Sequence, residues 1–202
     1  MVNLTRIYTR TGDDGTTALG DFSRTHKTDP RLAAYADVDE ANSALGVAVA
    51  LGGLPADLVT LLTQIQNDLF DVGADLCTPV TEATGGALRV TAADVARVEA
   101  ACDRYNADLA PLRSFVLPGG TPGAALLHVA RTVVRRAERS TWAARQAYPD
   151  ATNPQAATYL NRLSDLLFIL ARVANGARGD VLWQPGGSRD PDPSPPPPSS
   201  PS

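Results

Sequence analysis

Apolar residues recur at intervals of three and four along most of the chain, which is the spacing of one face of an α-helix. The clearest run covers 58–76, where leucine, isoleucine and valine alternate with polar residues at this spacing. Five segments follow the pattern, and breaks rich in glycine and proline separate most of them. The spacing predicts five helices, at about 30–51, 55–76, 91–105, 122–147 and 154–175.

Several of these segments carry helix start and stop signals. Asp29, followed by a proline, is a typical N-cap, and the glycine pair at 52–53 ends the first run. Thr91, with Asp94 three residues later, resembles a capping box with a shorter acid. The capping signals therefore agree with the helix boundaries that the periodicity predicts.

Strand-like alternation is confined to short pieces near 4–8 and 181–183. Five helices joined by loops of modest length predict an all-α fold, a five-helix up-and-down bundle over residues 29–176. Residues 1–28 are rich in Gly, Thr and Asp, and we expect them to be largely irregular. The stretch 185–202 is dominated by proline and serine, and we expect it to be a disordered tail.

Composition fits one globular domain, which we take as residues 1–184. Of the 202 residues, 44% are hydrophobic and 20% are charged. The formal net charge is −4, so neither nucleic acid nor an anionic membrane is an expected partner. No signal-peptide core and no apolar stretch of about 18 residues occur, so we expect a cytoplasmic protein.

The two cysteines, Cys77 and Cys102, lie far apart and outside any CxxC or Cys/His spacing. This pattern argues against a disulfide framework and against a thiolate metal site. We expect both to be small core residues in a reducing compartment.

The fourth predicted helix carries a row of charged residues. Arg131, Arg135 and Glu138 fall within a narrow arc, with His128 and Arg139 at its edge. Guanidinium groups on one face repel one another, and a triphosphate would offset this charge because the forks of arginine match phosphate oxygens. A solvated charged face is the alternative for this pattern on its own.

The segment 8–17, YTRTGDDGTT, could also bind phosphate. Its glycines free the backbone to turn N–H groups inward, and its threonines add hydroxyl donors. It lacks the GK[ST] ending of a Walker A loop and the strand–GxGxxG–helix context of a dinucleotide-binding fold. Its composition alone therefore does not identify a ligand.

Three other features carry polar or aromatic groups. The fifth helix is apolar except for one stripe, which must face a ligand, a partner or a network of hydrogen bonds between helices. Three carboxylates early in the first helix could pair with arginines, hold a divalent cation or face water. An aromatic residue, Phe115, precedes a sharp turn into the fourth helix. The stripe consists of Asn161, Asp165, Phe168 and Arg172, and the carboxylates are Asp37, Asp39 and Glu40.

Five motifs occur together in a fixed order, namely TRTGD at 9–13, YADVDEAN at 35–42, FVLPGG at 115–120, HVARTVVRRAER at 128–139 and YLNRLSDLLF at 159–168. With this combination the chain strongly resembles the PduO-type corrinoid (cobalamin) adenosyltransferases. The resemblance covers about residues 4–183, which is the whole chain except the tail.

The resemblance implies an enzyme that transfers the 5′-deoxyadenosyl group of ATP to cob(I)alamin, after reduction of cob(II)alamin, and releases triphosphate. It also implies a homotrimer of five-helix bundles with active sites at the subunit interfaces. ATP and cobalamin would be substrates, and Mg²⁺ would accompany the phosphates. A flavin-type reductase and an adenosylcobalamin-dependent enzyme would be partners.

The resemblance further implies roles for single residues. The N-terminal segment would wrap the ATP phosphates, a lysine would bind them, and a neighbouring subunit's arginine helix would hold the triphosphate. These ATP-binding residues are Thr9, Arg10, Thr11, Gly12, Asp13, Thr17, Lys27, Arg135, Arg136, Glu138, Arg139 and Asn161, of which Asn161 would contact the nucleoside.

The remaining implied roles concern catalysis and the corrin. Arg131 would pair across the interface with Asp39, and Arg135 would stabilise the leaving triphosphate. Phe115 would lie beneath the corrin, in place of the lower axial base. The metal ligands stay undefined, with Glu138 as a candidate for the Mg²⁺ on the phosphates.

One residue in the predicted phosphate-binding segment departs from the family pattern. Asp14 stands where family members often carry lysine, so one positive charge near the phosphates is missing, and Arg10 could replace it.

Two alternative functions remain open. A different ATP-using transferase would release ADP or phosphate instead of triphosphate. A non-enzymatic cobalamin carrier or chaperone would need neither the Gly/Thr loop nor the arginine row.

Overall fold

The structure, a computed structural model, describes residues 8–187. The predicted strand-like piece at 4–8 and the predicted tail at 185–202 lie almost wholly outside the described residues. The five predicted helices are present, each with ends within about two residues of the expected ones, so the all-α prediction is confirmed. They are α1 (Pro30–Leu51), α2 (Ala56–Cys77), α3 (Ala92–Asn106), α4 (Pro122–Ala147) and α5 (Pro154–Asn175).

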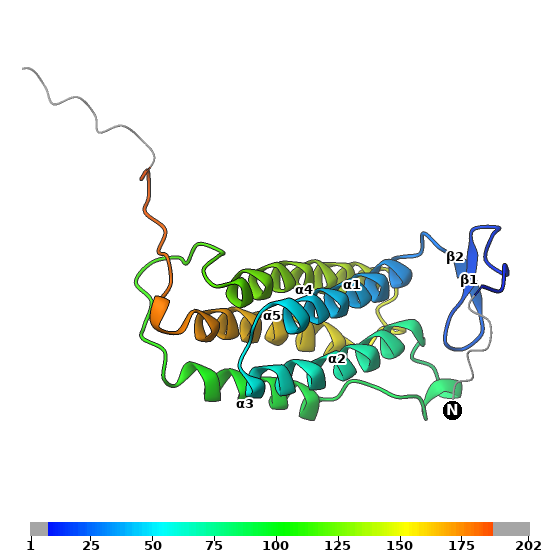
Figure 1. Cartoon of the computed structure of the whole chain (residues 1–202). Helices are drawn as coiled ribbons and strands as arrows, with labels where there is room; N and C mark the ends of the chain where they lie inside the picture. The colour runs from blue at the N-terminus through cyan, green and yellow to red at the C-terminus, as the bar shows by residue number, and fades with distance from the viewer. Residues whose placement is uncertain (1–7, 188–202) are drawn as a thin grey trace, which may run out of the picture.

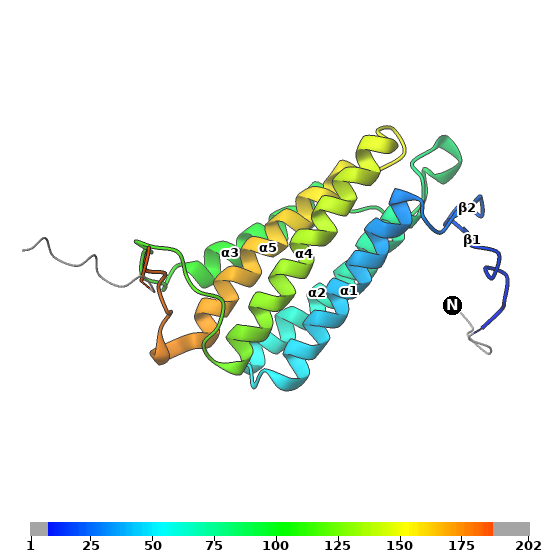
Figure 2. The same ribbon diagram turned by 90° about the horizontal axis from the view of Figure 1, so that it is seen from above.

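The helices run alternately up and down, as Figures 1 and 2 show. Helix α4 lies between α1 and α5, α2 packs against α1, and α3 packs against α5. One end of the bundle, here called the hairpin end, carries the N-terminal segment and the turn from α4 to α5. The other, here called the distal end, carries the loop 107–121 and the segment 176–187. Two short 3-10 helices, Glu82–Thr84 and Gly176–Arg178, lie in the connections.

Side-chain caps fix where four of these helices begin. Asp29 accepts a hydrogen bond from the amide of Arg31, and Asn153 caps α5 in the same way. At α3, Thr91 and Asp94 form the predicted capping box. Thr121 caps α4 and is followed by a proline. The capping signals read from the sequence are therefore confirmed where the structure tests them.

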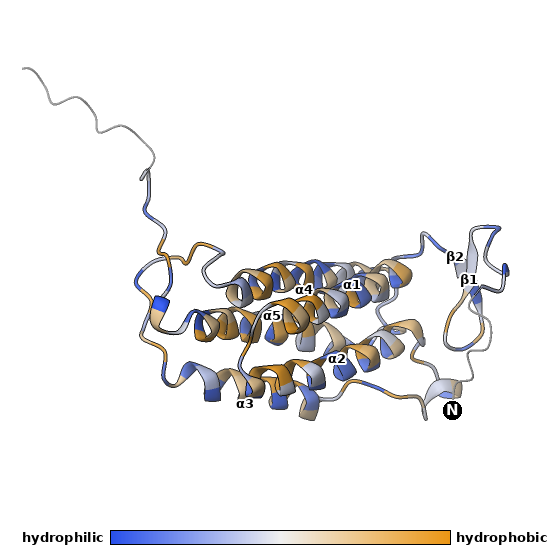
Figure 3. Cartoon of the chain, viewed as in Figure 1, coloured by the Kyte–Doolittle hydropathy of each residue, from blue (hydrophilic) through white to orange (hydrophobic). Residues whose placement is uncertain are grey.

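The helices bury leucine, valine, isoleucine and alanine side chains in one continuous core. Helix α1 differs from the others because its outer face also carries small apolar residues (Figure 3). Its apolar exposed positions include Ala33, Ala36, Val47 and Ala50, and its polar exposed positions are Asp39, Glu40 and Ser43. A helix that is apolar on most sides is typical of one that is covered on most sides. Among the described residues, no helix is both long and apolar enough to span a bilayer.

The N-terminal segment contains a hairpin that the sequence did not predict. Strands β1 (Thr16–Ala18) and β2 (Arg24–His26) pair antiparallel, and the hairpin projects beyond the bundle (Figure 1). Its loop is anchored at Gly20, whose amide donates to the carbonyl of Cys77 over 2.9 Å. A β-carbon at Gly20 would lie 2.1 Å from Oγ1 of Thr78, so only glycine allows this approach. Strands of three largely polar residues leave no period-2 signal, which is why the segment was expected to be irregular.

Candidate active site

Two arginines of α4, Arg131 and Arg135, lie one turn apart and differ in how far they are buried. Arg131 is half-buried, and its Nε is shielded from solvent without a hydrogen-bond partner among the described residues. Burial lowers the pKa of the Arg131 guanidinium, and the like charge of Arg135 lowers it further. Arg135 is exposed, and its guanidinium makes no hydrogen bond or ion pair in the described part of the chain. Both cations therefore remain available to an anion.

Arg136 has a partner within the chain. Its Nε lies 3.4 Å from Oδ1 of Asp37, and its Nη2 contacts the carboxylate of Glu40. Asp37 also accepts a hydrogen bond of 2.5 Å from Ser140 of α4. Two of the three acids predicted as candidate arginine partners thus hold α1 against α4. Asp39, the third, is exposed and makes no contact with Arg131 in the described chain.

Glu138 and Asn161 belong to a polar chain that crosses three helices. Nδ2 of Asn161 donates to Oε1 of Glu138 over 3.1 Å, and Nη1 of Arg162 donates to Oδ1 of Asn161 over 2.5 Å. Nε of Arg162 donates in turn to Glu99 of α3 over 2.8 Å. Within the predicted polar stripe of the fifth helix, only Asn161 bonds another helix in the described structure: Asp165 is exposed, and Arg172 bonds Asp180 and a loop carbonyl instead. Because one N–H and one oxygen lone pair of the Asn161 amide are used, its orientation is fixed while the second N–H and the second lone pair remain available.

The Gly/Thr segment brings hydroxyls and a lysine together. The Oγ1 atoms of Thr9 and Thr11 lie 2.9 Å apart, and Arg10 between them has a left-handed φ of 61°. A β-carbon at Gly12 would lie 3.1 Å from Nζ of Lys27, so the ammonium lies directly against this glycine. The amide of Lys27 donates to the carbonyl of Gly15 over 2.9 Å. The predicted phosphate-binding loop and its predicted lysine are thus brought together.

Asp14, where the family resemblance led us to expect a lysine, has a structural role in this segment. Its Oδ1 accepts hydrogen bonds from the amide and the hydroxyl of Thr16, over 2.9 and 2.8 Å. These two bonds, followed by the charge of Arg24, lower the pKa of Asp14. Arg24 lies 3.7 Å from the carboxylate, and it also donates to the carbonyl of Thr11 over 2.9 Å. A positive charge absent at position 14 is therefore present nearby at position 24.

Asp29 joins the hairpin to the bundle. Its carboxylate accepts hydrogen bonds from the guanidinium and amide of Arg31 over 2.7 to 3.0 Å, from Thr25 over 2.8 Å and from Tyr148 over 3.1 Å. The Arg31 guanidinium also lies over the Tyr148 ring, 3.9 Å from its centroid. Hydrogen bonds from Arg31 hold the pKa of Asp29 well below its usual value. The side chain of Asp29 is almost fully buried.

Phe115 projects from the loop at the distal end and is 78% exposed. Its carbonyl accepts a hydrogen bond of 2.8 Å from the amide of Trp183, and the two rings lie 5.9 Å apart. Val116 forms a bridge with Leu182, so the predicted strand-like piece at 181–183 pairs with the Phe115 segment. The polypeptide thus presents an exposed aromatic ring on a small paired platform.

The predicted site residues do not come together within one chain. Residues 9–28 make no hydrogen bond or ion pair with α4, and they lie at the hairpin end (Figure 2). Arg135 lies near the middle of α4, about 20 Å along the helix from Pro122 at 1.5 Å per residue. The loop 107–121, which contains Phe115, lies at the distal end (Figure 1). The single chain therefore contains separate parts of the predicted site.

Comparison with known proteins assigns the chain to a family. The family model described as cobalamin adenosyltransferase matches residues 7–174. The chain belongs to the cobalamin adenosyltransferase family. A corrinoid adenosyltransferase of Mycobacterium bovis is 64% identical over 189 residues, covering 93% of this chain and 97% of the relative. One from Mycobacterium leprae is 61% identical, covering 92% and 99%.

The fold agrees with solved structures of this family. A PduO-type ATP:corrinoid adenosyltransferase of Lactobacillus reuteri, in a Phe-to-His variant complexed with cobalamin and ATP, matches with a TM-score of 0.80. It is 36% identical, and the match covers 89% of this chain and 97% of that one. The activity of the family is ATP-dependent adenosyl transfer to a corrinoid, and this chain is an enzyme of that class.

Sequence reasoning missed an apolar groove between α1 and α2. The groove has a volume of about 550 Å³ and is lined by residues that include Tyr35, Asp39 and Phe70. Phe70 is 71% exposed although it belongs to an otherwise well-buried helix. Its position outside the apolar stripe of α2 was the signal that could have revealed it, because a large aromatic there has no core to join. In this adenosyltransferase the groove lies beside the exposed carboxylate of Asp39.

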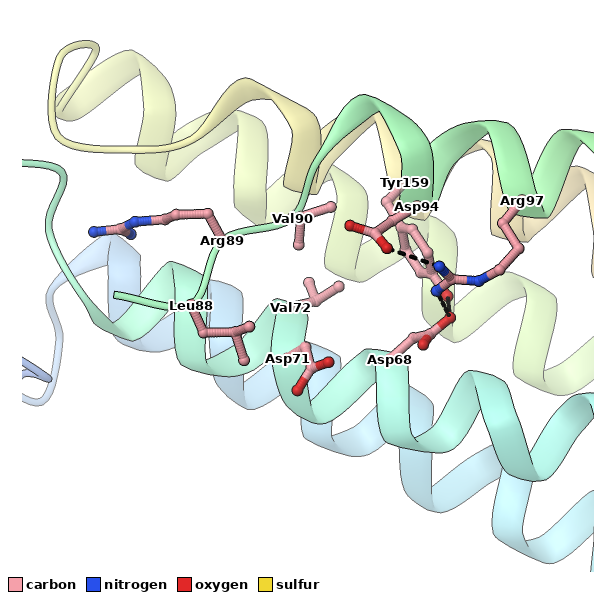
Figure 4. A pocket seen from close by; sticks show the side chains of 9 residues that line it. All are labelled: Asp68, Asp71, Val72, Leu88, Arg89, Val90, Asp94, Arg97 and Tyr159. Carbon is pink, nitrogen blue, oxygen red and sulfur yellow. Dashed lines mark hydrogen bonds and ion pairs between the residues drawn. The ribbon is translucent and has the colours of Figure 1, made fainter. Parts of the chain in front are cut away.

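A second cavity, shown in Figure 4, is too small for either substrate. It lies between α2 and α3, has a volume of about 90 Å³, and is lined by acids and arginines. Arg97 binds Asp68 and Asp94, both over 2.8 Å, and the buried Tyr159 donates to Asp68 over 2.9 Å. Ligand pockets usually have volumes of about 300–1,000 Å³. This cluster therefore ties α2, α3 and α5 together.

His128, at the edge of the arginine arc, is a core residue. Its ring is buried and packs edge-on against Phe168, with centroids 6.1 Å apart. Both ring nitrogens lack a hydrogen-bond partner among the described residues. Burial lowers the pKa of His128, and the charge of Arg131 lowers it further. The imidazole is therefore neutral at physiological pH and shielded from solvent.

Proposed function

We propose that this chain transfers the 5′-deoxyadenosyl group of ATP to the cobalt of cob(I)alamin and releases triphosphate. The observation that carries the proposal is the pair Arg131 and Arg135. These like charges lie one turn apart, and a buried nitrogen of Arg131 has no partner among the described residues. Such an arrangement is costly unless an anion or carboxylate offsets it. Cobalamin and ATP in the similar Lactobacillus reuteri structure support the assignment.

The reaction requires the protein to position the two substrates and to stabilise the charge of the leaving triphosphate. Cob(I)alamin is itself a strong nucleophile, so its cobalt forms a bond to C5′ while the C5′–O bond breaks and its electron pair leaves with the triphosphate. No general base is required, in keeping with a buried neutral His128 and an exposed His26. Arginine and lysine lower the barrier by stabilising the charge that develops on the leaving group.

The proposed division of labour follows from the contacts. The segment 9–13 and Lys27 bind the phosphates, because hydroxyls, glycine backbone and an ammonium converge there. Arg135 binds the leaving triphosphate as an exposed, unpaired fork. The amide of Asn161, held by Glu138 and Arg162, offers a fixed hydrogen-bonding edge for the nucleoside. Arg139, exposed one turn beyond Arg135, adds positive charge, whereas Asp37 and Glu40 offset the charge of Arg136.

Mg²⁺ fits this site as a companion of the phosphates. Within residues 8–187, no group of three or more His, Cys, Asp and Glu side chains could hold a metal ion by itself. Mg²⁺ usually binds through one or two carboxylates together with substrate phosphates and water. Glu138, one turn from Arg135 on α4, is the carboxylate that would contribute, and the ion would neutralise phosphate charge there.

We also propose a homotrimer whose active sites lie between subunits. The N-terminal segment and the arginine row are separate in one chain, so a second copy would have to bring them together. The small apolar outer face of α1 is suited to burial against another subunit. Asp39 on that face is exposed, and Nε of Arg131 has no partner among the described residues, so the two would pair across the interface.

For the corrin, the proposal assigns Phe115 and the groove between α1 and α2. Phe115 supplies an exposed apolar ring that cannot coordinate cobalt, so it would occupy the lower axial position without providing a ligand. Loss of the lower ligand makes Co(II) easier to reduce. Phe70 and Tyr35 supply further apolar surface in the groove. A cytoplasmic location, a flavin-type reductase and an adenosylcobalamin-dependent acceptor enzyme complete the proposal.

One assay tests the proposal. The protein is mixed anaerobically with ATP, Mg²⁺ and chemically reduced cobalamin, and the spectrum is followed for formation of alkylcobalamin. Triphosphate is quantified in the same samples. Adenosylcobalamin and triphosphate in equal amounts are expected. Release of ADP or phosphate would indicate another ATP-using transferase, and tight corrinoid binding without turnover would indicate a carrier or chaperone. Either outcome contradicts the proposal.

A further inference from the structure

The segment that presents Phe115 has little support of its own. It contains no helix and only a single isolated bridge, between Val116 and Leu182. Three hydrogen bonds of 2.8 Å join it to the segment 181–183: Leu117 donates to Val181, Trp183 to Phe115, and the hydroxyl of Ser114 to Trp183. One short antiparallel pair is marginally stable in water. Something else must therefore hold these two segments in place.

The anchor is a buried ion pair at the end of α5. Nε of Arg172 lies 2.8 Å from Oδ2 of Asp180, and the two side chains are only 9% and 12% exposed. Nδ2 of Asn175 donates to the other oxygen of Asp180 over 3.0 Å. Asp180 immediately precedes the segment 181–183. The carboxylate thus fixes where that segment leaves the bundle.

The same two α5 side chains hold both ends of the loop that carries Phe115. Nη2 of Arg172 donates to the carbonyl of Ala110 over 2.8 Å, before Phe115. Oδ1 of Asn175 accepts from the amide of Thr121 over 3.0 Å, after it. Gly120, with a φ of 112°, lies so close to Asn175 that a β-carbon there would clash with the amide. The last turn of α5 therefore holds both flanks of the Phe115 loop and, through Asp180, the segment that pairs with it.

We propose that Arg172, Asn175 and Asp180 are positioning residues that set the location of the Phe115 ring. They do not need to touch either substrate, because they act through the backbone of the loop and of segment 181–183. Trp183, packed against Phe115 at an interplanar angle of 59°, restricts the ring from one side. The inference rests on the proposed role of Phe115 beneath the corrin. A displacement of about 1 Å in such a group can cost about 10²-fold in rate.

Hydrogen exchange tests the clamp without any substrate. The amides of Leu117 and Trp183 should be protected in the wild-type protein and exchange about tenfold faster in Asp180→Ala, because their partners become mobile. Amides in the core of α2 and α4 should not change. Arg178→Ala is the matched control, since Arg178 is exposed in the neighbouring 3-10 helix. Unchanged protection of both amides in Asp180→Ala would overturn the inference.

Turnover rates of the same variants then distinguish a role in positioning Phe115 from a role in general stability. In Asp180→Ala, the rate started from cob(II)alamin with a reductant should fall at least about tenfold more than the rate started from cob(I)alamin. Arg172→Lys keeps the charge but loses the fork, so its effect should be intermediate. Asp180→Asn keeps the size of the side chain but replaces one of its two acceptor oxygens by a donor, so it keeps the test possible if the alanine variant does not fold.

The possible failures are distinguishable. If wild-type protein does not adenosylate cobalamin, the proposed function is wrong, while hydrogen exchange still reports on the clamp. If wild-type turnover is normal and Asp180→Ala loses protection with both rates reduced equally, the residues are structural only and the positioning role is wrong. Selective loss of the cob(II)alamin-started rate, with core protection intact, supports it.

Discussion

Arg136 of α4 and Asp37 of α1 form an ion pair, with Nε and Oδ1 3.4 Å apart. The preceding residue, Arg135, is exposed and has no side-chain partner in the described chain. Two adjacent arginines with the same charge thus differ in what they contact. One joins two helices of the bundle, and the other remains available to an anion.

This difference predicts that alanine at position 135 lowers activity, whereas alanine at position 136 mainly lowers stability. Arg135→Ala should lower kcat by about 10²- to 10³-fold with an unchanged Tm, because the leaving triphosphate loses a charge-stabilising donor. Arg136→Ala should lower stability by up to about 1 kcal/mol, since the ion pair is partly exposed, with a smaller effect on kcat. Steady-state kinetics and thermal unfolding on both variants decide the matter. The assignment fails if Arg136→Ala reduces kcat more than Arg135→Ala does.

Phe115→Ala is expected to separate the two starting states of cobalamin. Removal of the exposed ring lets a lower axial ligand return, so the reaction started from cob(II)alamin should slow about 10-fold more than that started from cob(I)alamin. Folding should be unaffected because the ring is 78% exposed. Phe22→Ala, which removes another highly exposed ring at the hairpin tip, is the control. Equal slowing of both reactions would rule out ligand displacement by Phe115.

Most of the fold was predictable because its signals are local. Helix ends at Asp29 and Thr91 follow from caps that span three or four residues, and the bundle follows from a 3.6-residue period. The hairpin was not predictable, because each strand has only three residues. Its stability comes from distant contacts, such as the hydrogen bond from Gly20 to Cys77.

The candidate site was predictable in its residue types but not in its pairings. The helical arc placed Arg131, Arg135 and Glu138 together, as the structure does. Periodicity could not show that Arg136 binds Asp37, because these residues lie about a hundred positions apart in sequence. It also could not show that Asn161 binds Glu138, since that contact depends on the packing of α4 against α5. The periodicity of one chain also cannot show which residues pair between subunits.

Two substitutions at Asp14 separate its charge from its hydrogen bonds. Asp14→Asn keeps an oxygen that accepts from Thr16 and removes the negative charge, so the KM for ATP should stay equal or fall a fewfold. Asp14→Ala removes the acceptor, loosens the turn between the loop and β1, and should raise the KM. Steady-state kinetics with ATP as the varied substrate measure the KM of each variant. A higher KM for both variants would mean that the carboxylate charge itself, through Arg24, is required.

Asp29 predicts an acid-dependent loss of stability at the hairpin end. Its pKa is lower in the folded protein than in the unfolded chain, where it is about 3.9, so the folded state binds its proton less readily. The stability that Asp29 contributes is therefore complete above about pH 5 and declines as the pH falls through and below 3.9. Asp29→Asn should cost about 2 kcal/mol at pH 7, because the buried ion pair with Arg31 is lost and one acceptor oxygen becomes a donor, although asparagine still caps α1.

The difference in unfolding free energy between the wild type and Asp29→Asn should therefore shrink as the pH falls. Urea unfolding followed by circular dichroism at pH 7, 5, 4 and 3 measures this difference. Asp21→Asn is the control, because Asp21 is an exposed carboxylate of the same hairpin that binds only Ser23 in the described structure, and its difference should be small at every pH. A difference for Asp29→Asn that stays constant from pH 7 to pH 3 would show that the charge of Asp29 does not hold the hairpin end together.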